Sequence, residues 1–88
     1  MASSVKYTVY VEPAVLRSMR SLPREIARRI DAVLLSLEEE PRPHGVKRLA
    51  VRGGWRVRIG DYRVLYTIAD GARTVGVYRV GHRKDVYR

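Results

Sequence analysis

The feature that most constrains this fold is a stretch in which arginines alternate with apolar residues. It runs from Trp55 to Tyr66 and reads WRVRIGDYRVLY. Because successive side chains of a β-strand point to opposite faces, the alternation predicts two strands with one apolar and one cationic face. The Gly60–Asp61 pair between them is typical of a hairpin turn. A cationic face of this kind suits the phosphate chain of a nucleic acid.

The net positive charge of the chain arises entirely from its second half. Residues 1–40 carry six basic and six acidic side chains, whereas residues 41–88 carry twelve basic and three acidic ones, so the net charge of +9 arises after residue 40. Fifteen of the 18 basic residues are arginine, whose planar guanidinium binds phosphate in a bidentate manner. This asymmetry indicates a polyanionic partner that is attracted by charge and bound through counterion release.

Length and composition narrow the class of protein further. The 88 residues suffice for a single domain, 1–88, with one modest core. The absence of cysteine excludes disulfides and thiolate metal sites, and with only two histidines we expect no metal and no cofactor. No apolar stretch has the length of a signal peptide core or a membrane span, so we expect a cytoplasmic protein without a membrane partner.

The remaining patterns predict an α+β fold. Residues 7–11 alternate and are rich in β-branched and aromatic side chains, which favours a first strand. Apolar residues at helical spacing predict two helices, one after Pro13 and one after Pro23. Three further strands are expected at residues 55–59, 62–69 and 74–80. We therefore expect two N-terminal helices packed on one face of a small, mainly antiparallel four-stranded sheet whose other face stays open.

Side-chain parity gathers three arginines on the open face of this sheet. Arg56 and Arg58 share one side of their strand, and Arg63 joins them if Val64 and Tyr66 face the core. Preorganised cations stabilise the negative charge that develops on a phosphate during transfer. The sequence therefore predicts a site where a phosphate could be both bound and attacked.

A proton acceptor for such chemistry has to be another type of residue, because arginine stays protonated. In RNA the neighbouring 2′-hydroxyl is a built-in nucleophile, so a protein needs to align it, accept its proton and stabilise the leaving oxygen. Tyr87 and His82 follow the last expected strand and are the two candidates for the acceptor. Tyr78 lies within that strand, and the sequence does not show which face of the sheet it occupies. It belongs either to the core or to a surface on which bases stack.

These residues also carry a family resemblance. The order of one strand, two helices and then WRVRIGDYRVLYTI and VYRVGHRKDVY resembles the RelE/ParE superfamily of bacterial and archaeal toxins, and more closely its RelE branch. The resemblance implies the RelE-like microbial ribonuclease-type fold and a toxin of a type II toxin–antitoxin system. Such a toxin is a ribosome-dependent endoribonuclease that cleaves mRNA in the decoding (A) site by 2′-hydroxyl attack and so inhibits translation. The implied partners are a cognate RelB-like antitoxin, the ribosome and mRNA.

The same resemblance assigns roles to individual positions. Arg63 and Arg83 match the family's phosphate-contacting arginines, and Tyr87 matches its C-terminal catalytic or base-stacking tyrosine. Arg56 and Arg58 stand where the best-studied members have lysines, a change that keeps phosphate binding and leaves more of the proton transfer to Tyr87. The expected catalytic set is Arg58, Arg63, Arg83 and Tyr87, and the expected RNA-binding set is Arg56, His82 and Lys84.

Two alternatives share this fold. One is a ParE-like inhibitor that binds DNA gyrase and performs no chemistry, and the other is a basic RNA- or ribosome-binding module. The nuclease is favoured because a gyrase inhibitor has no need of the arginine and tyrosine set. For an antitoxin helix, Val15, Met19 and Leu34 predict an apolar groove along the helices, unless all three belong to the toxin's own core.

Overall fold

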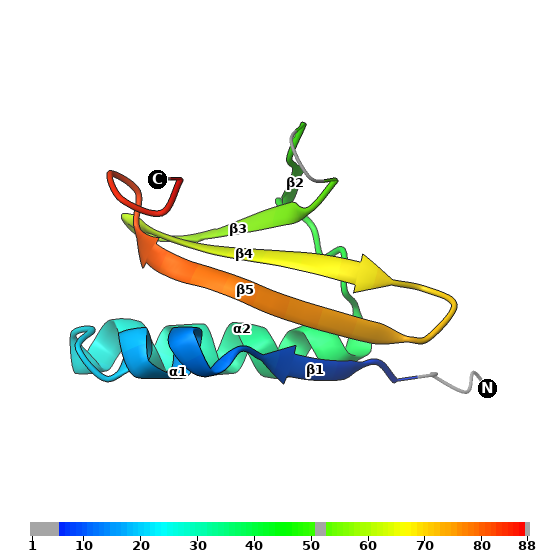
Figure 1. The fold of residues 1–88 in the computed structure, drawn as a ribbon, viewed down its shortest axis with the longest axis horizontal. Helices are drawn as coiled ribbons and strands as arrows, with labels where there is room; N and C mark the ends of the chain where they lie inside the picture. Colours follow the sequence, from blue (N-terminus) through cyan, green and yellow to red (C-terminus); the bar gives the residue numbers. More distant parts are fainter. Residues whose placement is uncertain (1–5, 51–52, 88) are drawn as a thin grey trace.

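The computed structural model describes residues 6–50 and 53–87, which form a helical layer and a sheet (Figure 1). In chain order the elements are β1 (Thr8–Val11), α1 (Pro13–Met19), α2 (Arg24–Glu39), β2 (Lys47–Arg48), β3 (Trp55–Ile59), β4 (Tyr62–Ala69) and β5 (Thr74–His82). Both helices lie on one face of the sheet, and we call the face away from them the open face (Figure 1). The predicted α+β architecture is confirmed.

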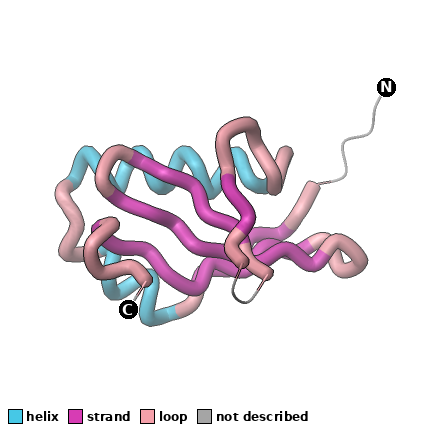
Figure 2. The backbone as a smooth tube through the Cα atoms, turned by 90° about the horizontal axis from the view of Figure 1, so that it is seen from above, coloured by secondary structure: helices cyan, strands magenta, loops and turns pink. Residues whose placement is uncertain are grey.

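The sheet has five strands in the order β1-β5-β4-β3-β2. β1 runs parallel to β5, although α1, α2 and three strands lie between them in the chain. The other neighbouring strands are antiparallel. Figure 2 shows the strands side by side with the helices behind them. The predicted strand count of four was short by one. The additional strand, β2, has only two residues and is too short to show an alternating pattern.

The core lies between the helices and the sheet. α2 contributes Ile30 and Leu37, and β4 contributes Val64 and Tyr66, all four with no exposed surface. Burial of each such side chain stabilises the fold by roughly 1.5–3 kcal/mol. The Tyr66 hydroxyl donates a hydrogen bond of 2.8 Å to the carbonyl of Pro41, and burial raises the pKa of this hydroxyl to about 12. This bond ties the segment after α2 to the centre of the sheet.

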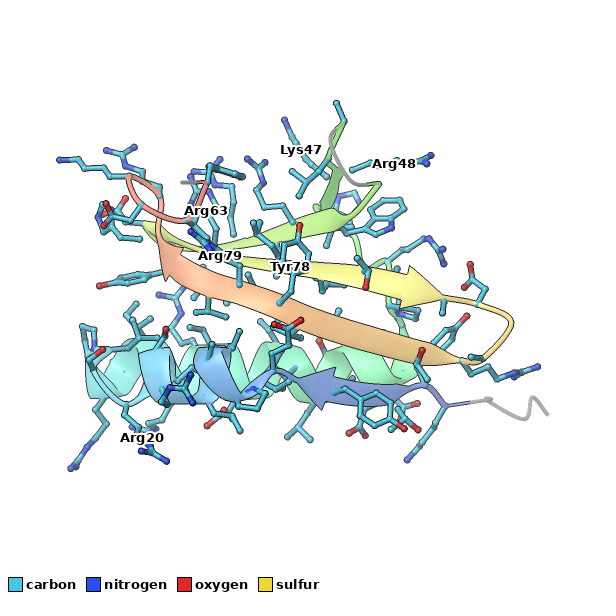
Figure 3. All side chains as sticks on the ribbon, viewed as in Figure 1. Arg20, Lys47, Arg48, Arg63, Tyr78 and Arg79 are labelled. Carbon is cyan, nitrogen blue, oxygen red and sulfur yellow. The ribbon has the colours of Figure 1, made fainter. Side chains whose placement is uncertain are left out.

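A β-bulge in β5 interrupts the alternation of that strand. Val75 and Val77 belong to the core, and the next core valine is Val80, so the spacing changes from two residues to three. The register against β4 shifts at the same place, which leaves Tyr78 as the additional residue. As a result Tyr78 and Arg79 both lie on the open face (Figure 3).

Of the two alternatives for Val15, Met19 and Leu34, the structure supports the one that assigns them to the protein's own core and not to a groove for a partner. Val15 is only 3% exposed and is part of the core. Met19 and Leu34 are partly buried and pack against that core. Val15 therefore stabilises the domain itself and is not accessible to a partner.

An ion-pair cluster joins the start of the chain to the β4–β5 hairpin. Asp70 accepts hydrogen bonds from two nitrogens of Arg42, at 3.1 and 2.7 Å, and from the hydroxyl of Tyr7, at 2.7 Å. The Arg42 guanidinium also lies 5.2 Å from the centre of the Trp55 ring, within the range of a cation–π contact. The hydrogen bonds from Arg42 and Tyr7 lower the pKa of the Asp70 carboxyl to about 2.

Asp70→Asn should therefore destabilise the protein at pH 7 and much less at pH 2. A pKa below the ordinary value means that the folded state favours the ionised carboxylate, so the stabilisation is complete above about pH 4 and is lost as the pH falls through about 2. We expect the urea midpoints of wild type and variant to converge over this range.

Glu25→Gln is the control for this titration. Glu25 forms an exposed ion pair of 3.5 Å with Arg28 on the same helix, and ion pairs of this type contribute little to stability. A midpoint difference between Asp70→Asn and wild type that does not change with pH would contradict the assigned role of the carboxylate.

Candidate nucleic-acid interface

Two arginines meet across the β3–β4 hairpin. Arg58 pairs in register with Arg63, which in turn pairs with Gly81 on β5. Val64, the residue after Arg63, is fully buried in the core. Because neighbouring residues of a strand point to opposite faces, Arg63 and its register partners lie on the open face. The structure thus brings Arg58 and Arg63 together.

These two arginines differ in exposure. Arg58 is exposed, whereas Arg63 is only 8% exposed. One terminal nitrogen of Arg63 donates to the carbonyls of Gly60 and Tyr62, at 3.2 and 3.1 Å. A buried guanidinium stays charged and requires such acceptors. Arg63 therefore supplies a fixed positive charge at the turn, beside a more accessible one on Arg58.

A second cationic row crosses the sheet next to the first. Its members, which are register partners on four neighbouring strands, are Lys47, Arg56, Leu65 and Arg79. Figure 3 shows Lys47 and Arg79 on the side away from the helices. Within the described residues, the Nε atom of Arg56 is the one buried side-chain nitrogen or oxygen without a hydrogen-bond partner. An unsatisfied donor of this kind favours an acceptor such as a phosphate oxygen.

The C-terminal turn folds back over the open face (Figure 1). Val86 is 2% exposed, its N–H donates to the carbonyl of His82 at 2.9 Å, and its own carbonyl accepts a hydrogen bond of 2.8 Å from Nε of Arg79. A Cβ atom on Gly81 would lie 3.8 Å from the Val86 Cα, so Val86 rests directly on the backbone of β5. Tyr87, next in the chain, is 54% exposed. The turn thus holds Tyr87 on the same face as the arginines.

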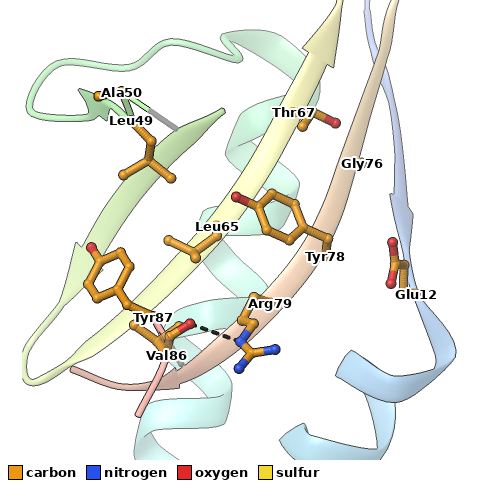
Figure 4. A pocket seen from close by; sticks show the side chains of 10 residues that line it. All are labelled: Glu12, Leu49, Ala50, Leu65, Thr67, Gly76, Tyr78, Arg79, Val86 and Tyr87. Atoms are coloured by element: carbon orange, nitrogen blue, oxygen red, sulfur yellow. Dashed lines mark hydrogen bonds between the residues drawn. The ribbon is translucent and has the colours of Figure 1, made fainter. Parts of the chain in front are cut away.

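Beside this turn the open face is hollowed into a pocket of about 890 Å³ (Figure 4). The residues that line it are Glu12, Leu49, Ala50, Leu65, Thr67, Gly76, Tyr78, Arg79, Val86 and Tyr87. Its volume lies in the range of about 300–1,000 Å³ that is usual for small-molecule sites. Leu65 and Arg79 of the second cationic row and Tyr87 therefore border a space that is large enough for a nucleotide.

Arg83 and Lys84 occupy the turn after β5, and both are exposed. The N–H of Arg83 donates to the carbonyl of Asp61 at 2.8 Å, which joins this turn to the β3–β4 turn. The two side chains form only a loose ion pair, with Nε of Arg83 3.9 Å from Oδ1 of Asp61. Exposed pairs of this length are weak, so the Arg83 guanidinium can readily change partner.

His82 lies apart from the arginines. It pairs in register with Tyr62, and the two rings meet edge to face, with centres 5.5 Å apart and an angle of 79° between their planes. Tyr62 shares its side of β4 with the core residues Val64 and Tyr66, so the His82 ring lies on the helix side of the sheet. Of the two candidate proton acceptors, the structure places only Tyr87 on the open face.

Arg79 and Lys47 also lie on this face, although the sequence pattern did not predict it. In a regular strand with Val77 in the core, Arg79 would face the helices, so simple alternation does not place it on the open face. The change in valine spacing between Val77 and Val80 is the signal that could have revealed the bulge. Lys47 sits in the two-residue strand β2, for which the sequence offers no comparable signal.

Over residues 6–50 and 53–87, no group of three or more histidine, aspartate and glutamate side chains is placed to hold a metal ion. No helix in the same ranges is long and apolar enough to cross a membrane.

Comparison with known proteins gives consistent matches over most of the chain. Residues 9–87 match the family model described as the ParE toxin of the type II toxin–antitoxin system parDE. Toxin RelG of Mycobacterium tuberculosis is 37% identical over 84 residues, which cover 93% of this chain and 97% of RelG.

Solved structures extend the comparison to three dimensions. The archaeal RelE–RelB complex of Pyrococcus horikoshii OT3 gives a TM-score of 0.82 at 29% identity, over 92% of this chain and 99% of the matched one. The toxin–antitoxin complex RelBE2 of M. tuberculosis gives 0.77 at 34% identity, over 90% of this chain and all of the matched one.

The fold and these matches define a toxin of a type II toxin–antitoxin system, and the chain belongs to the RelE/ParE superfamily. Within that superfamily it is a member of the RelE-like branch.

Arg79→Ala should loosen the turn that carries Tyr87. The variant loses the hydrogen bond to the Val86 carbonyl, so the Val86 amide should exchange with solvent about five- to tenfold faster, the effect of one hydrogen bond. Hydrogen–deuterium exchange followed by NMR measures this directly, with Arg58→Ala as a control on the same face. Unchanged exchange in Arg79→Ala would show that other contacts hold the turn.

Proposed function

We propose that this toxin is a ribosome-dependent, metal-independent endoribonuclease that cleaves mRNA in the decoding site and so stops translation. One observation carries the proposal: Arg56, Arg58, Arg63 and Tyr87 share the open face, on which Tyr87 also lines a pocket that fits a nucleotide. Cations that are already in place stabilise a phosphorane-like transition state without reorganisation. The ribosome would supply the mRNA in a fixed, single-stranded conformation.

The proposed reaction needs only the RNA, water and these side chains. The 2′-oxygen forms a bond to the adjacent phosphorus while the bond from phosphorus to the 5′-oxygen of the next nucleotide breaks. The phenolate oxygen of Tyr87 accepts the 2′-hydroxyl proton as it departs, and Arg83 stabilises the leaving 5′-oxygen until a water molecule donates a proton to it. The products are a 2′,3′-cyclic phosphate and a new 5′-hydroxyl end.

Five further residues have assigned tasks in this scheme. The exposed Arg58 contacts the reacting phosphate, and the buried Arg63 adds fixed positive charge from beside it. Arg56 and Lys84 bind neighbouring phosphates along the RNA. His82 lies on the helix side of the sheet, so it would contact the RNA only at the edge of the interface.

A cognate RelB-like antitoxin is the proposed protein partner. The related toxins of P. horikoshii and M. tuberculosis were solved in complexes of this kind. On this chain a shallow apolar pocket of about 330 Å³ between β1 and α2 suits a segment of such a partner, and Leu35 at its rim is 65% exposed.

Gyrase inhibition is the second candidate, because the matching family model is that of the ParE toxin. Such an inhibitor would leave mRNA intact on active ribosomes and would produce DNA damage on expression. A basic ribosome-binding module would do neither.

Arg83→Ala should lower mRNA cleavage by roughly 10²–10³, the usual effect of removing one donor that stabilises the negative charge of a transition state. The measurement is a translation assay on purified ribosomes with primer-extension mapping of cuts. Cuts are expected only when ribosomes are present. Arg28→Ala, an exposed arginine of α2, is the matched control and should cut like wild type. Near wild-type cleavage by a folded Arg83→Ala would remove this residue from the mechanism.

Tyr87→Phe should lower single-turnover cleavage by roughly 10²–10⁴, the range for a lost acid–base group. Phenylalanine keeps the ring and any stacking but cannot accept a proton. Tyr10→Phe is the control, because Tyr10 is a similarly exposed tyrosine, at 60%, on β1. An active Tyr87→Phe beside an inactive His82→Ala would transfer the role of base to His82.

A further inference from the structure

Tyr78 lies flat across the open face. As the additional residue of the bulge it starts from β5, and its hydroxyl reaches the beginning of β3 (Figure 4). A Cβ atom built on Gly54 would lie 3.2 Å from the Tyr78 hydroxyl oxygen and 3.0 Å from the Tyr66 carbonyl. The phenol end therefore occupies space that a side chain at position 54 would need.

The surroundings of this ring leave it accessible from the pocket. Tyr78 is half-buried and lines the pocket together with Leu65 and Thr67 of β4. Gly76, two residues before Tyr78, also lines the pocket but has no side chain to cover it. An aromatic side chain at the edge of a cationic surface is the usual platform on which proteins stack the bases of single-stranded RNA.

The pocket is lined by side chains of opposite charge. Tyr87 lies on one side of it and Glu12 on the other, and the consecutive residues Tyr78 and Arg79 lie between them (Figure 4). Glu12 is the N-cap residue of α1, yet its side chain makes no capping hydrogen bond, and it is exposed. A carboxylate repels phosphate but accepts hydrogen bonds from the amino group of a base. Glu12 thus suits a base, and Arg79 suits a phosphate.

We propose that Tyr78 and Glu12 form a nucleobase subsite for the nucleotide next to the scissile phosphate. The base stacks on the Tyr78 ring and donates a hydrogen bond from its amino group to the Glu12 carboxylate, while Arg79 and Arg56 contact its phosphate. Adenine, cytosine and guanine carry such an amino group, whereas uracil does not, so the subsite discriminates against uracil. This inference rests on the proposed RNA cleavage.

The test compares mRNAs that differ only in the base beside the mapped cut. Wild type should prefer amino-bearing bases to uracil by about fivefold or more, as expected for one charge-assisted hydrogen bond. Glu12→Gln should bring the ratio of cleavage at amino-bearing bases to cleavage at uracil close to one. An amide side chain can accept a hydrogen bond from an amino group and can also donate one to a carbonyl of uracil. Tyr78→Leu and Tyr78→Ala should lower cleavage by roughly 5- to 150-fold, the range for one base–aromatic stack, and Tyr78→Phe should retain it.

A binding measurement separates failure of this inference from failure of the proposed function. NMR spectra of the wild-type toxin with a 2′-O-methylated trinucleotide, which cannot be cleaved, should show ring-current shifts at Tyr78. Ribose 5-phosphate, which has no base, should show none. If wild type cuts mRNA but the Tyr78 and Glu12 variants match it in rate and preference, the subsite is wrong and the nuclease stands. If wild type does not cut, the nuclease is wrong, and an absence of shifts at Tyr78 then overturns the subsite as well.

Discussion

A single extra residue in β5 determines how the open face is arranged. The bulge at Tyr78 lets Val77 and Val80 both reach the core, although they are three residues apart. It thereby keeps Arg79 on the same open side as the preceding Tyr78, and it places Gly81 on that side as well. Arg79 then bonds to the C-terminal turn, Gly81 provides the flat surface under that turn, and Tyr78 lines the pocket. Without the bulge, either Arg79 would face the core or the core valines on one side of it would face solvent. The core and the candidate site therefore depend on the same irregularity.

Charge is distributed over this face in a graded manner. Arg63 is buried and held by two backbone carbonyls, so its position is fixed before any ligand arrives. Arg58 is exposed, and Arg83 is held only by a long contact to Asp61, so both can adjust to a bound phosphate. A fixed cation beside adjustable ones combines preorganisation with adaptation to the substrate.

Local patterns predicted most of the fold and part of the site. Strict alternation from Trp55 to Tyr66 identified the hairpin and the shared face of its arginines, because one buried face fixes the register of a strand. The same reasoning could not place Arg79, since the bulge is a property of how β5 packs on β4. It also missed β2, and it could not show that the ring of His82 turns toward Tyr62. These features depend on contacts between segments that are distant in the sequence.

The most direct test of the account is the chemistry of the mRNA ends that the wild-type toxin leaves on the ribosome. Attack by the 2′-hydroxyl predicts 5′-hydroxyl ends, which a polynucleotide kinase labels without prior phosphatase treatment, and 2′,3′-cyclic phosphates on the upstream fragments. Fragments with 5′-phosphate ends would mean that an activated water, and not the 2′-hydroxyl, attacks the phosphate. Intact mRNA on active ribosomes would contradict the nuclease itself.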